Sequence, residues 1–234
     1  MSGVVLHGVL AEAPARGDPA LTPAGSLFAA LGRLDPDAPA EALRRAAVTH
    51  FRLLERLCAE VPVIPARFPQ VFESAAAAQH AVATEQARWR TLLAWLGDDA
   101  EFAVTLRKGP DSHAASSAGQ AQDRPGDAAG ASYLRARAVA ARRRATRANS
   151  DDAAHTLADV LARSYRAATV APSRDVRRDR VVMVLAPRSA RALVAQSVAR
   201  WATRFDRLAP GLSGPMPVFT FLPEQAEADV ARSP

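Results

Sequence analysis

The residues that most often carry enzyme chemistry are few and scattered in this chain. Its five histidines, at positions 7, 50, 80, 113 and 155, include no pair four residues apart, no HExxH pattern and no Cys/His cluster. Cys58 lies two helical turns from His50, too far for a hydrogen bond along one helix, so a Cys/His dyad is not supported. We therefore predict no metal site, and we interpret Cys58 as a small buried hydrophobe.

Other catalytic signatures are also missing. The sequence has no GxGxxG, GxxxxGKS or GxSxG pattern. The acidic pair at Asp98 and Asp99 follows Gly97 and suits a turn, and the pair at Asp151 and Asp152 suits the first turn of a helix. We expect no catalytic residues, no cofactor and no enzymatic activity.

The charge balance favours an acidic partner. The chain of 234 residues has 30 basic and 24 acidic side chains, a net charge of +6, and Lys108 is its single lysine. The arginine bias is explained equally by GC-rich coding or by guanidinium chemistry. Its longest apolar runs are shorter than the roughly 20 residues of a membrane-spanning helix. We expect a soluble, cytoplasmic protein with no membrane contact.

The first 108 residues predict an N-terminal α+β domain with helices on one face of a small sheet. Residues 4–10 favour a strand, followed by a polar loop over 11–25. Residues 74–97 show helical spacing, and residues 101–107 alternate as a half-buried strand with Glu101 on its exposed face. Another helix begins near residue 40, and its expected apolar face comprises Leu43, Ala47, Phe51, Leu54 and Cys58.

The stretch VIPARFPQVF, residues 63–72, joins the two predicted helices. Pro62 and Pro65 fix φ and remove main-chain donors, so the segment should stay extended. We interpret it first as a structural crossover. The functional alternative is a docking edge for a partner's strand or helix, with three candidate binding residues, Arg67, Phe68 and Phe72.

Residues 109–130 are rich in Gly, Ser, Ala and Asp and predict a flexible linker. A long Arg-rich helix should follow, with Arg135, Arg137 and Arg142 as candidate partner-binding residues. Its arginines wrap most of the helix and no aromatic residues are interleaved for base stacking. A solvated face, or one that meets an acidic protein, is therefore favoured over nucleic acid, which we do not expect as a partner.

The helix opens a C-terminal domain over 131–223, before a loose tail at 224–234. Residues 181–186 form an apolar run typical of a central strand, and residues 194–208 have the spacing of an amphipathic helix closed by Pro210 and Gly211. The stretch GPMPVFTFLP predicts a short final strand in which Phe219, another candidate binding residue, shares a face with Phe221.

In this order the segments resemble the gas vesicle protein GvpL/GvpF family. VPVIPARFPQVF is similar to its LPLRFGTVF segment, and GASYLRARAVAARRRA to its GxxYLxxRR helix start. DRVVMVLAPRSARALVAQSVARW resembles its R…NxAYLVP strand and helix, and GPMPVFTFLP its terminal GPWPPYSF. The chain departs from the family pattern at Pro69, Gln70, Met216 and Phe219.

The resemblance implies an N-terminal α+β domain and a ferredoxin-like C-terminal domain. It also implies a non-enzymatic accessory protein of gas vesicle formation, acting as an assembly factor or chaperone at the gas vesicle or in the cytoplasm. The expected partners are the hydrophobic major shell protein and other gas vesicle accessory proteins. Two rival interpretations are a basic nucleic-acid-binding adaptor and, by fold analogy alone, a small-molecule-binding regulatory domain.

Overall fold

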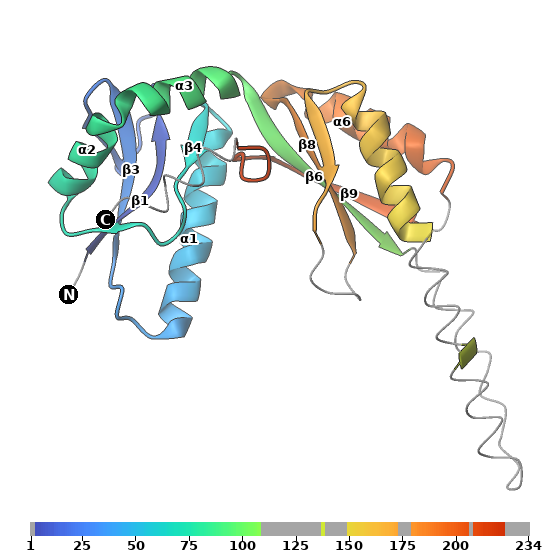
Figure 1. Ribbon diagram of the computed structural model, residues 1–234, viewed down its shortest axis with the longest axis horizontal. Coiled ribbons are helices and arrows are strands. Elements are labelled where there is room, and N and C mark those ends of the chain that lie inside the picture. Colours follow the sequence, from blue (N-terminus) through green and yellow to red (C-terminus); the bar gives the residue numbers. More distant parts are fainter. Residues whose placement is uncertain (1–2, 109–136, 139–148, 173–178, 206–207, 223–234) are drawn as a thin grey trace, which may run out of the picture. The chain divides into compact units, whose positions relative to one another are not determined.

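The computed structural model describes residues 3–108, 137–138, 149–172, 179–205 and 208–222 (Figure 1). The contacts divide the chain into two compact units that are discontinuous in sequence. Unit 1 combines Met1–Phe102 with Leu185–Arg191 and the residues from Gly214 onward, and unit 2 combines Ala103–Val184 with Ala192–Ser213. The domain boundaries expected at residues 108, 130 and 223 stay a prediction.

The sheet of unit 1 is antiparallel. Its order is β2-β3-β1-β4, and β5 also pairs with β1. The strand predicted at residues 4–10 is confirmed, but the loop predicted over 11–25 is wrong at its end, because β2 and β3 form a hairpin there. Pro23 fits in β2 because this strand ends the sheet order, where a missing donor is tolerated. The five strands are β1 (Gly3–Leu10), β2 (Leu21–Ala24), β3 (Leu27–Leu34), β4 (Val63–Pro65) and β5 (Val71–Phe72).

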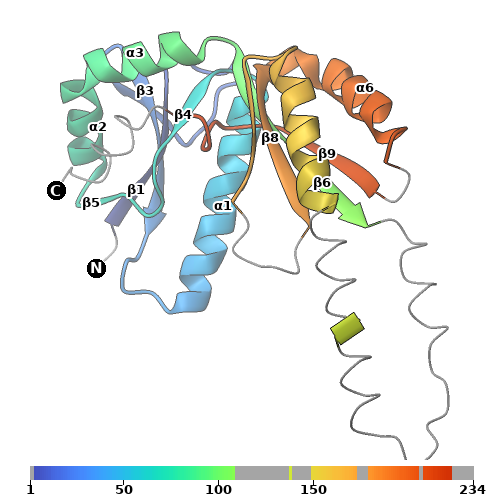
Figure 2. The same cartoon turned by 45° about the vertical axis from the view of Figure 1, so that its right-hand side comes forward.

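Helices cover both faces of this sheet, not one face as predicted. In Figure 1 and Figure 2, α1 (Ala40–Cys58) lies on one side of β1 and β3, and α2 (Ala75–Thr84) lies on the other. The reason is visible in β1, where six consecutive residues from Val5 to Leu10 are buried, so neither face is left to solvent.

The single helix predicted over 74–97 is two helices, α2 and α3 (Gln86–Leu96). Ser74 caps the first one, because its hydroxyl accepts the main-chain N–H of Ala77 at 3.1 Å. The backbone of Glu85, with φ −90° and ψ 14°, leaves the helical region and separates the two.

The second sheet has the order β7-β8-β6-β9. The strands predicted at 101–107 and 181–186 are confirmed as β6 (Asp99–Lys108) and β8 (Arg180–Pro187). Glu101 was wrongly placed on an exposed face, since it is 1% exposed. The other elements are β7 (Ala167–Val170), β9 (Leu208–Met216), α6 (Arg191–Ala202) and a helix over residues 149–162.

The end of the chain differs from the prediction. Helix α6 ends at Ala202, and β9 begins at Leu208, so Pro210 and Gly211 lie inside a strand. β9 ends the sheet order, where a proline is tolerated. The strand ends at Met216, earlier than predicted. Phe219 and Phe221 lie beyond it in a loop, so the prediction that they share a face of a final strand is wrong.

The predicted linker at 109–130 and most of the Arg-rich helix lie outside the described residues. In the part of the chain that the structure does describe, no helix has the length and apolar character needed to cross a membrane.

Candidate functional site

Helix α1 carries an apolar surface that the core does not cover. The core takes His50, Leu54, Leu57 and Cys58 from this helix, whereas Val48 is 51% exposed and Phe51 is 37% exposed. The Phe51 ring stacks on Phe219, which is 36% exposed, with ring centroids 5.9 Å apart and planes inclined by 16°. Three of the four large hydrophobic side chains exposed within the described ranges thus lie together. We call Val48, Phe51 and Phe219 the α1 aromatic surface.

A buried carboxylate holds the loop that carries Phe219. Glu101 accepts the main-chain N–H of Thr220, the N–H of Phe221 at 3.1 Å and the Thr220 hydroxyl at 3.2 Å. Val218, 1% exposed, anchors the loop in the core. Burial raises the pKa of Glu101, and the N–H groups of the loop oppose that shift. The loop is therefore held on both sides of Phe219, by the buried Val218 before it and by the hydrogen bonds of Thr220 and Phe221 after it.

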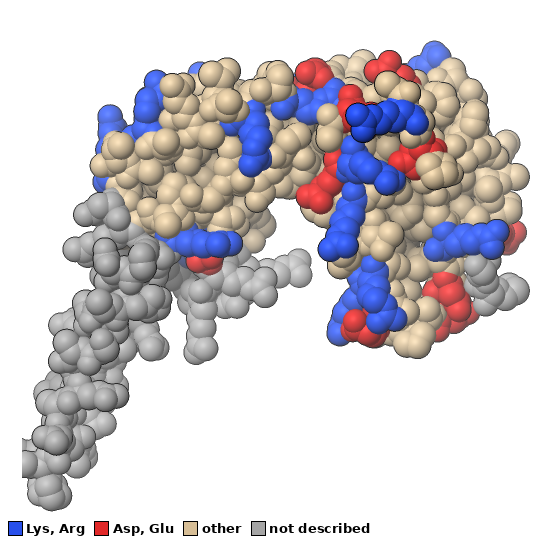
Figure 3. All heavy atoms as spheres, turned by 180° about the vertical axis from the view of Figure 1, so that it is seen from behind, with Lys and Arg blue, Asp and Glu red and all other residues tan. Residues whose placement is uncertain are grey.

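Charged side chains of both signs lie along helix α1. The helix contains four arginines and two glutamates, and Figure 3 shows basic side chains along it with acidic ones among them. Arg44 and Arg45 lie 3.5 and 3.6 Å from Glu41 in exposed pairs, which contribute little to stability. Arg52 is exposed beside Phe51. The apolar surface therefore lies on a helix of mixed charge in which arginine is in excess.

The stretch 63–72 is only partly accessible. Val63, Ile64 and Ala66 are each 1% exposed, and the Ala66 N–H donates to the His7 carbonyl at 2.8 Å. A partner's strand could therefore pair with β4 only if the parts of the chain that bury Val63 and Ile64 moved away. Arg67 is exposed, so the docking-edge hypothesis is limited to residues 67–72.

Phe68 packs against a buried histidine pair. The Nδ1 atoms of His7 and His50 are 2.8 Å apart, so one neutral ring donates and the other accepts. The Phe68 ring centroid lies 5.1 Å from that of His50. Burial lowers the pKa of His7, and burial together with the nearby His7 lowers the pKa of His50 to about 4. Both rings therefore stay neutral near pH 7.

A bulge in β1 aims His7 at α1. The register of β1 against β3 shifts between Leu6 and Gly8. His7 contacts His50, and a Cβ on Gly8 would lie 3.0 Å from the Leu54 side chain, so two successive residues face the same helix. A Cβ on Gly32 would lie 2.4 Å from His7 Nε2, which leaves no room for a larger residue. The sequence alone did not predict the His7–His50 contact, because the contact depends on the bulge in β1.

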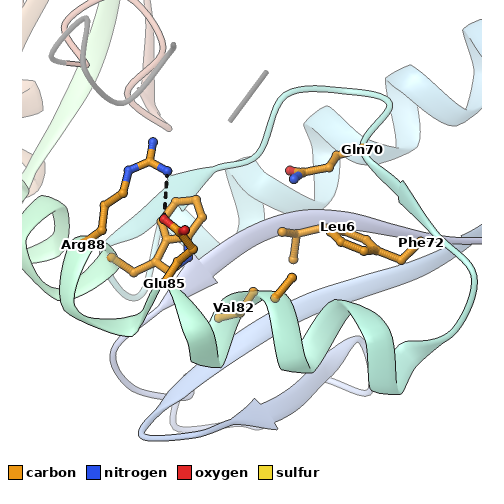
Figure 4. A pocket seen from close by; sticks show the side chains of 8 residues that line it. Leu6, Gln70, Phe72, Val82, Glu85 and Arg88 are labelled. Carbon is orange, nitrogen blue, oxygen red and sulfur yellow. Dashed lines mark hydrogen bonds and ion pairs between the residues drawn. The ribbon is translucent and has the colours of Figure 1, made fainter. Parts of the chain in front are cut away.

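Phe72 lies apart from these residues, in a small pocket between the sheet and the helices α2 and α3 (Figure 4). The cavity is about 10 Å³, room for one water. Gln70 Oε1 and Trp89 Nε1 are buried here without a protein partner. At its side, Arg88 pairs with Glu85 at 3.3 Å. The pocket suits a bridging water, not an organic ligand.

Cys58 and two ion pairs support the fold. Cys58 is 3% exposed, and burial, the largest influence, raises the pKa of its thiol to about 11, so its predicted role as a buried hydrophobe is confirmed. Asp98 pairs with Arg188, and Asp151 with Arg180. Among the residues with described positions, no group of three His, Cys, Asp or Glu side chains could hold a metal ion.

The predicted site residues are distributed as follows. Phe68 and Phe219 contact neighbouring residues of α1, His50 and Phe51. Arg137 is exposed in a helical segment, and Arg135 and Arg142 lie outside the described residues. Sequence analysis missed Glu101 and His7, although an acidic residue in an otherwise apolar strand was a usable signal for Glu101.

The comparisons place the chain in a family. The family model described as gas vesicle synthesis protein GvpL/GvpF matches residues 8–223. The chain belongs to the GvpL/GvpF family of gas vesicle synthesis proteins. A search of curated proteins finds no match.

Two solved structures share the fold. The crystal structure of the gas vesicle protein GvpF from Anabaena sp. PCC7120 is similar over 95% of this chain and 99% of that chain, with a TM-score of 0.61 and 14% identity. The corresponding values for GvpF from Microcystis aeruginosa are 94%, 99%, 0.60 and 15%. The likeness covers a mixed α/β fold with antiparallel sheets. The family supports a role in gas vesicle formation.

Proposed function

We propose that this chain is a non-enzymatic accessory protein that binds the hydrophobic shell protein of the gas vesicle as an assembly factor or chaperone, in the cytoplasm or at the vesicle. The α1 aromatic surface is the observation that carries the proposal. An exposed stacked pair of aromatic rings in a soluble unit is typical of a protein-binding surface. A hydrophobic client needs such a surface to cover its own apolar area before assembly.

The proposal extends to the C-terminal part of the chain. The elements from β6 to β9 run strand, helix, strand, strand, helix, strand, with the sheet order β9-β6-β8-β7. This order supports a ferredoxin-like domain. The flexible linker, the long Arg-rich helix and the arginines at 135, 137 and 142 belong to the proposal as a second, basic surface for acidic gas vesicle proteins.

Co-expression with the shell protein tests the proposal. We expect more soluble shell protein and more floating vesicles with the chain than without it. Purified chain should also retain the shell protein in a pull-down. An unchanged soluble fraction together with no retention would contradict the proposal.

The nucleic-acid alternative is tested on the same preparation. A binding isotherm with duplex and single-stranded DNA at low and moderate salt should show no binding at moderate salt. Retention of DNA at moderate salt, with a steep salt dependence, would favour the adaptor interpretation.

A further inference from the structure

The environment of Glu101 is unusual for a buried carboxylate. A buried charge is normally paired with a cation, because desolvation is costly. Glu101 is 1% exposed, and the groups that oppose the effect of burial on its pKa are hydrogen-bond donors of residues 219–221. The loop therefore supplies the polar surroundings that water would give an exposed carboxylate.

The interaction also restricts the loop. Main-chain N–H groups of neighbouring residues converge on one side chain only when the chain turns around that side chain. Two of the donors belong to Thr220 and one to Phe221, the residues directly after Phe219. The direction of the Phe219 side chain is therefore fixed by the residues that follow it, and its ring comes to rest on Phe51.

The core alone does not explain an acidic residue at this position. Its neighbours in β6, Ala100 and Phe102, are both fully buried. A well-packed apolar side chain often stabilises a fold as much as a buried polar group does. What a buried polar group can add is a preference for the one conformation that satisfies its hydrogen bonds. Here that conformation is the one in which Phe219 joins the α1 aromatic surface.

We propose that Glu101 is the positioning residue of the partner-binding surface: its carboxylate gathers the loop 219–221 and thereby sets Phe219 against Phe51. This inference rests on the proposed function. Glu101 does not touch the partner; it acts through Phe219. Without it, Phe51 and Val48 stay on α1, but the second ring of the stack is no longer held in place.

The test compares Glu101→Gln, Phe219→Ala and the double variant. Gln has the shape of Glu but no charge: its Oε1 can accept the two main-chain N–H groups only in weaker, neutral hydrogen bonds, and its NH₂ group replaces the oxygen that accepts the Thr220 hydroxyl. We expect Glu101→Gln and Phe219→Ala each to weaken binding of the purified shell protein by about tenfold. The double variant should bind no more weakly than Phe219→Ala alone, because both changes remove the same contact. Asp179→Asn, a partly exposed carboxylate paired with Arg107, is the matched control and should bind normally.

A second readout does not need the partner. Amide hydrogen exchange in residues 219–222 should accelerate in Glu101→Gln, while exchange in α1 and β1 stays as in the wild type. If Glu101→Gln does not fold, Thr220→Val removes the hydroxyl donor and leaves the carboxylate and its main-chain partners in place. It should speed exchange in the same loop to a smaller degree.

The outcomes separate the two proposals. Unchanged exchange in the loop, or losses of binding that multiply in the double variant, would overturn the role of Glu101. A wild-type chain that does not bind the shell protein would overturn the proposed function, and the exchange experiment would still decide whether Glu101 holds the loop.

Discussion

Two neighbouring faces of helix α1 carry apolar side chains in opposite environments. On one face, Leu54 and Leu57 are at most 1% exposed and join the core with Cys58. On the other face, Val48 and Phe51 are more than a third exposed. His50 is buried and the next residue, Phe51, is exposed, because successive residues are turned by about 100° around a helix. One face stabilises the fold, and the other presents an apolar surface.

This difference shows that an apolar side chain on a helix need not be part of a core. Covering Phe51 would need only one more loop or helix, yet the Phe219 loop adds a second exposed ring beside it. The two faces should therefore respond in opposite ways to substitution. Changes on the buried face should reduce stability, and changes on the exposed face should reduce binding.

The largest effect on stability is expected from Leu54→Ala. Leu54 is fully buried, and its loss leaves a cavity against β1, so the free energy of unfolding should fall by about 2 to 5 kcal/mol. Urea denaturation followed by circular dichroism measures this. A smaller loss than that caused by Phe51→Ala would contradict the division of α1 into a buried and an exposed face.

Acid should have the next largest effect, through the buried face of α1. The pKa values of His7 and His50 are lowered in the folded chain, whereas an unfolded histidine takes up a proton near pH 6.5. The stability from these neutral rings is therefore present above pH 6.5 and is lost as the pH falls toward about 4, the pKa of His50. Thermal melts between pH 7.5 and 4 should show the decline.

His50→Gln sharpens the acid experiment. Glutamine can still bond to the His7 ring but does not titrate, so the decline below pH 6.5 should become shallower. An identical pH profile in the variant and the wild type would show that other groups cause the acid sensitivity.

A smaller change in stability is expected on the exposed face. Phe51→Ser and Phe219→Ser each remove one ring of a half-exposed stack, so the free energy of unfolding should change by about 1 kcal/mol or less. The same denaturation curves measure it. A loss as large as that of Leu54→Ala would mean that the rings belong to the core.

The smallest effect on stability is expected from Arg52→Glu, within about 0.5 kcal/mol, because the side chain is exposed. It should weaken capture of an acidic partner at low salt, and the difference should shrink at higher salt because screening shortens the range of the charge. Arg200→Glu on α6 is the control. Equal effects of the two reversals would point to overall charge and not to the α1 surface.

Local patterns predicted the elements with a strong period. β1, β6, β8 and α1 appear near their expected places because alternation or helical spacing marks them. The β2–β3 hairpin was missed because its proline suggested a loop, and β9 was missed because Pro210 and Gly211 suggested a helix end. β2 and β9 each lie at the end of the strand order of their sheet, and proline is tolerated in an edge strand.

The site was harder to predict than the elements. Phe219 was named as a candidate binding residue, and that role stays a prediction. Its partner Phe51 was assigned to the core, because a helical period shows which residues share a face but not whether that face is covered. The role of Glu101 depends on residues 119 and 120 positions away in the sequence. No local pattern carries that information.

The most direct test of the account is binding of the purified shell protein to three forms of the chain: wild type, Phe51→Ser/Phe219→Ser, and Leu193→Ser. Leu193 is 61% exposed on α6 and lies outside the α1 aromatic surface. The account predicts that the double variant loses binding while Leu193→Ser binds like the wild type. Wild-type binding by the double variant, with both variants folded, would contradict it.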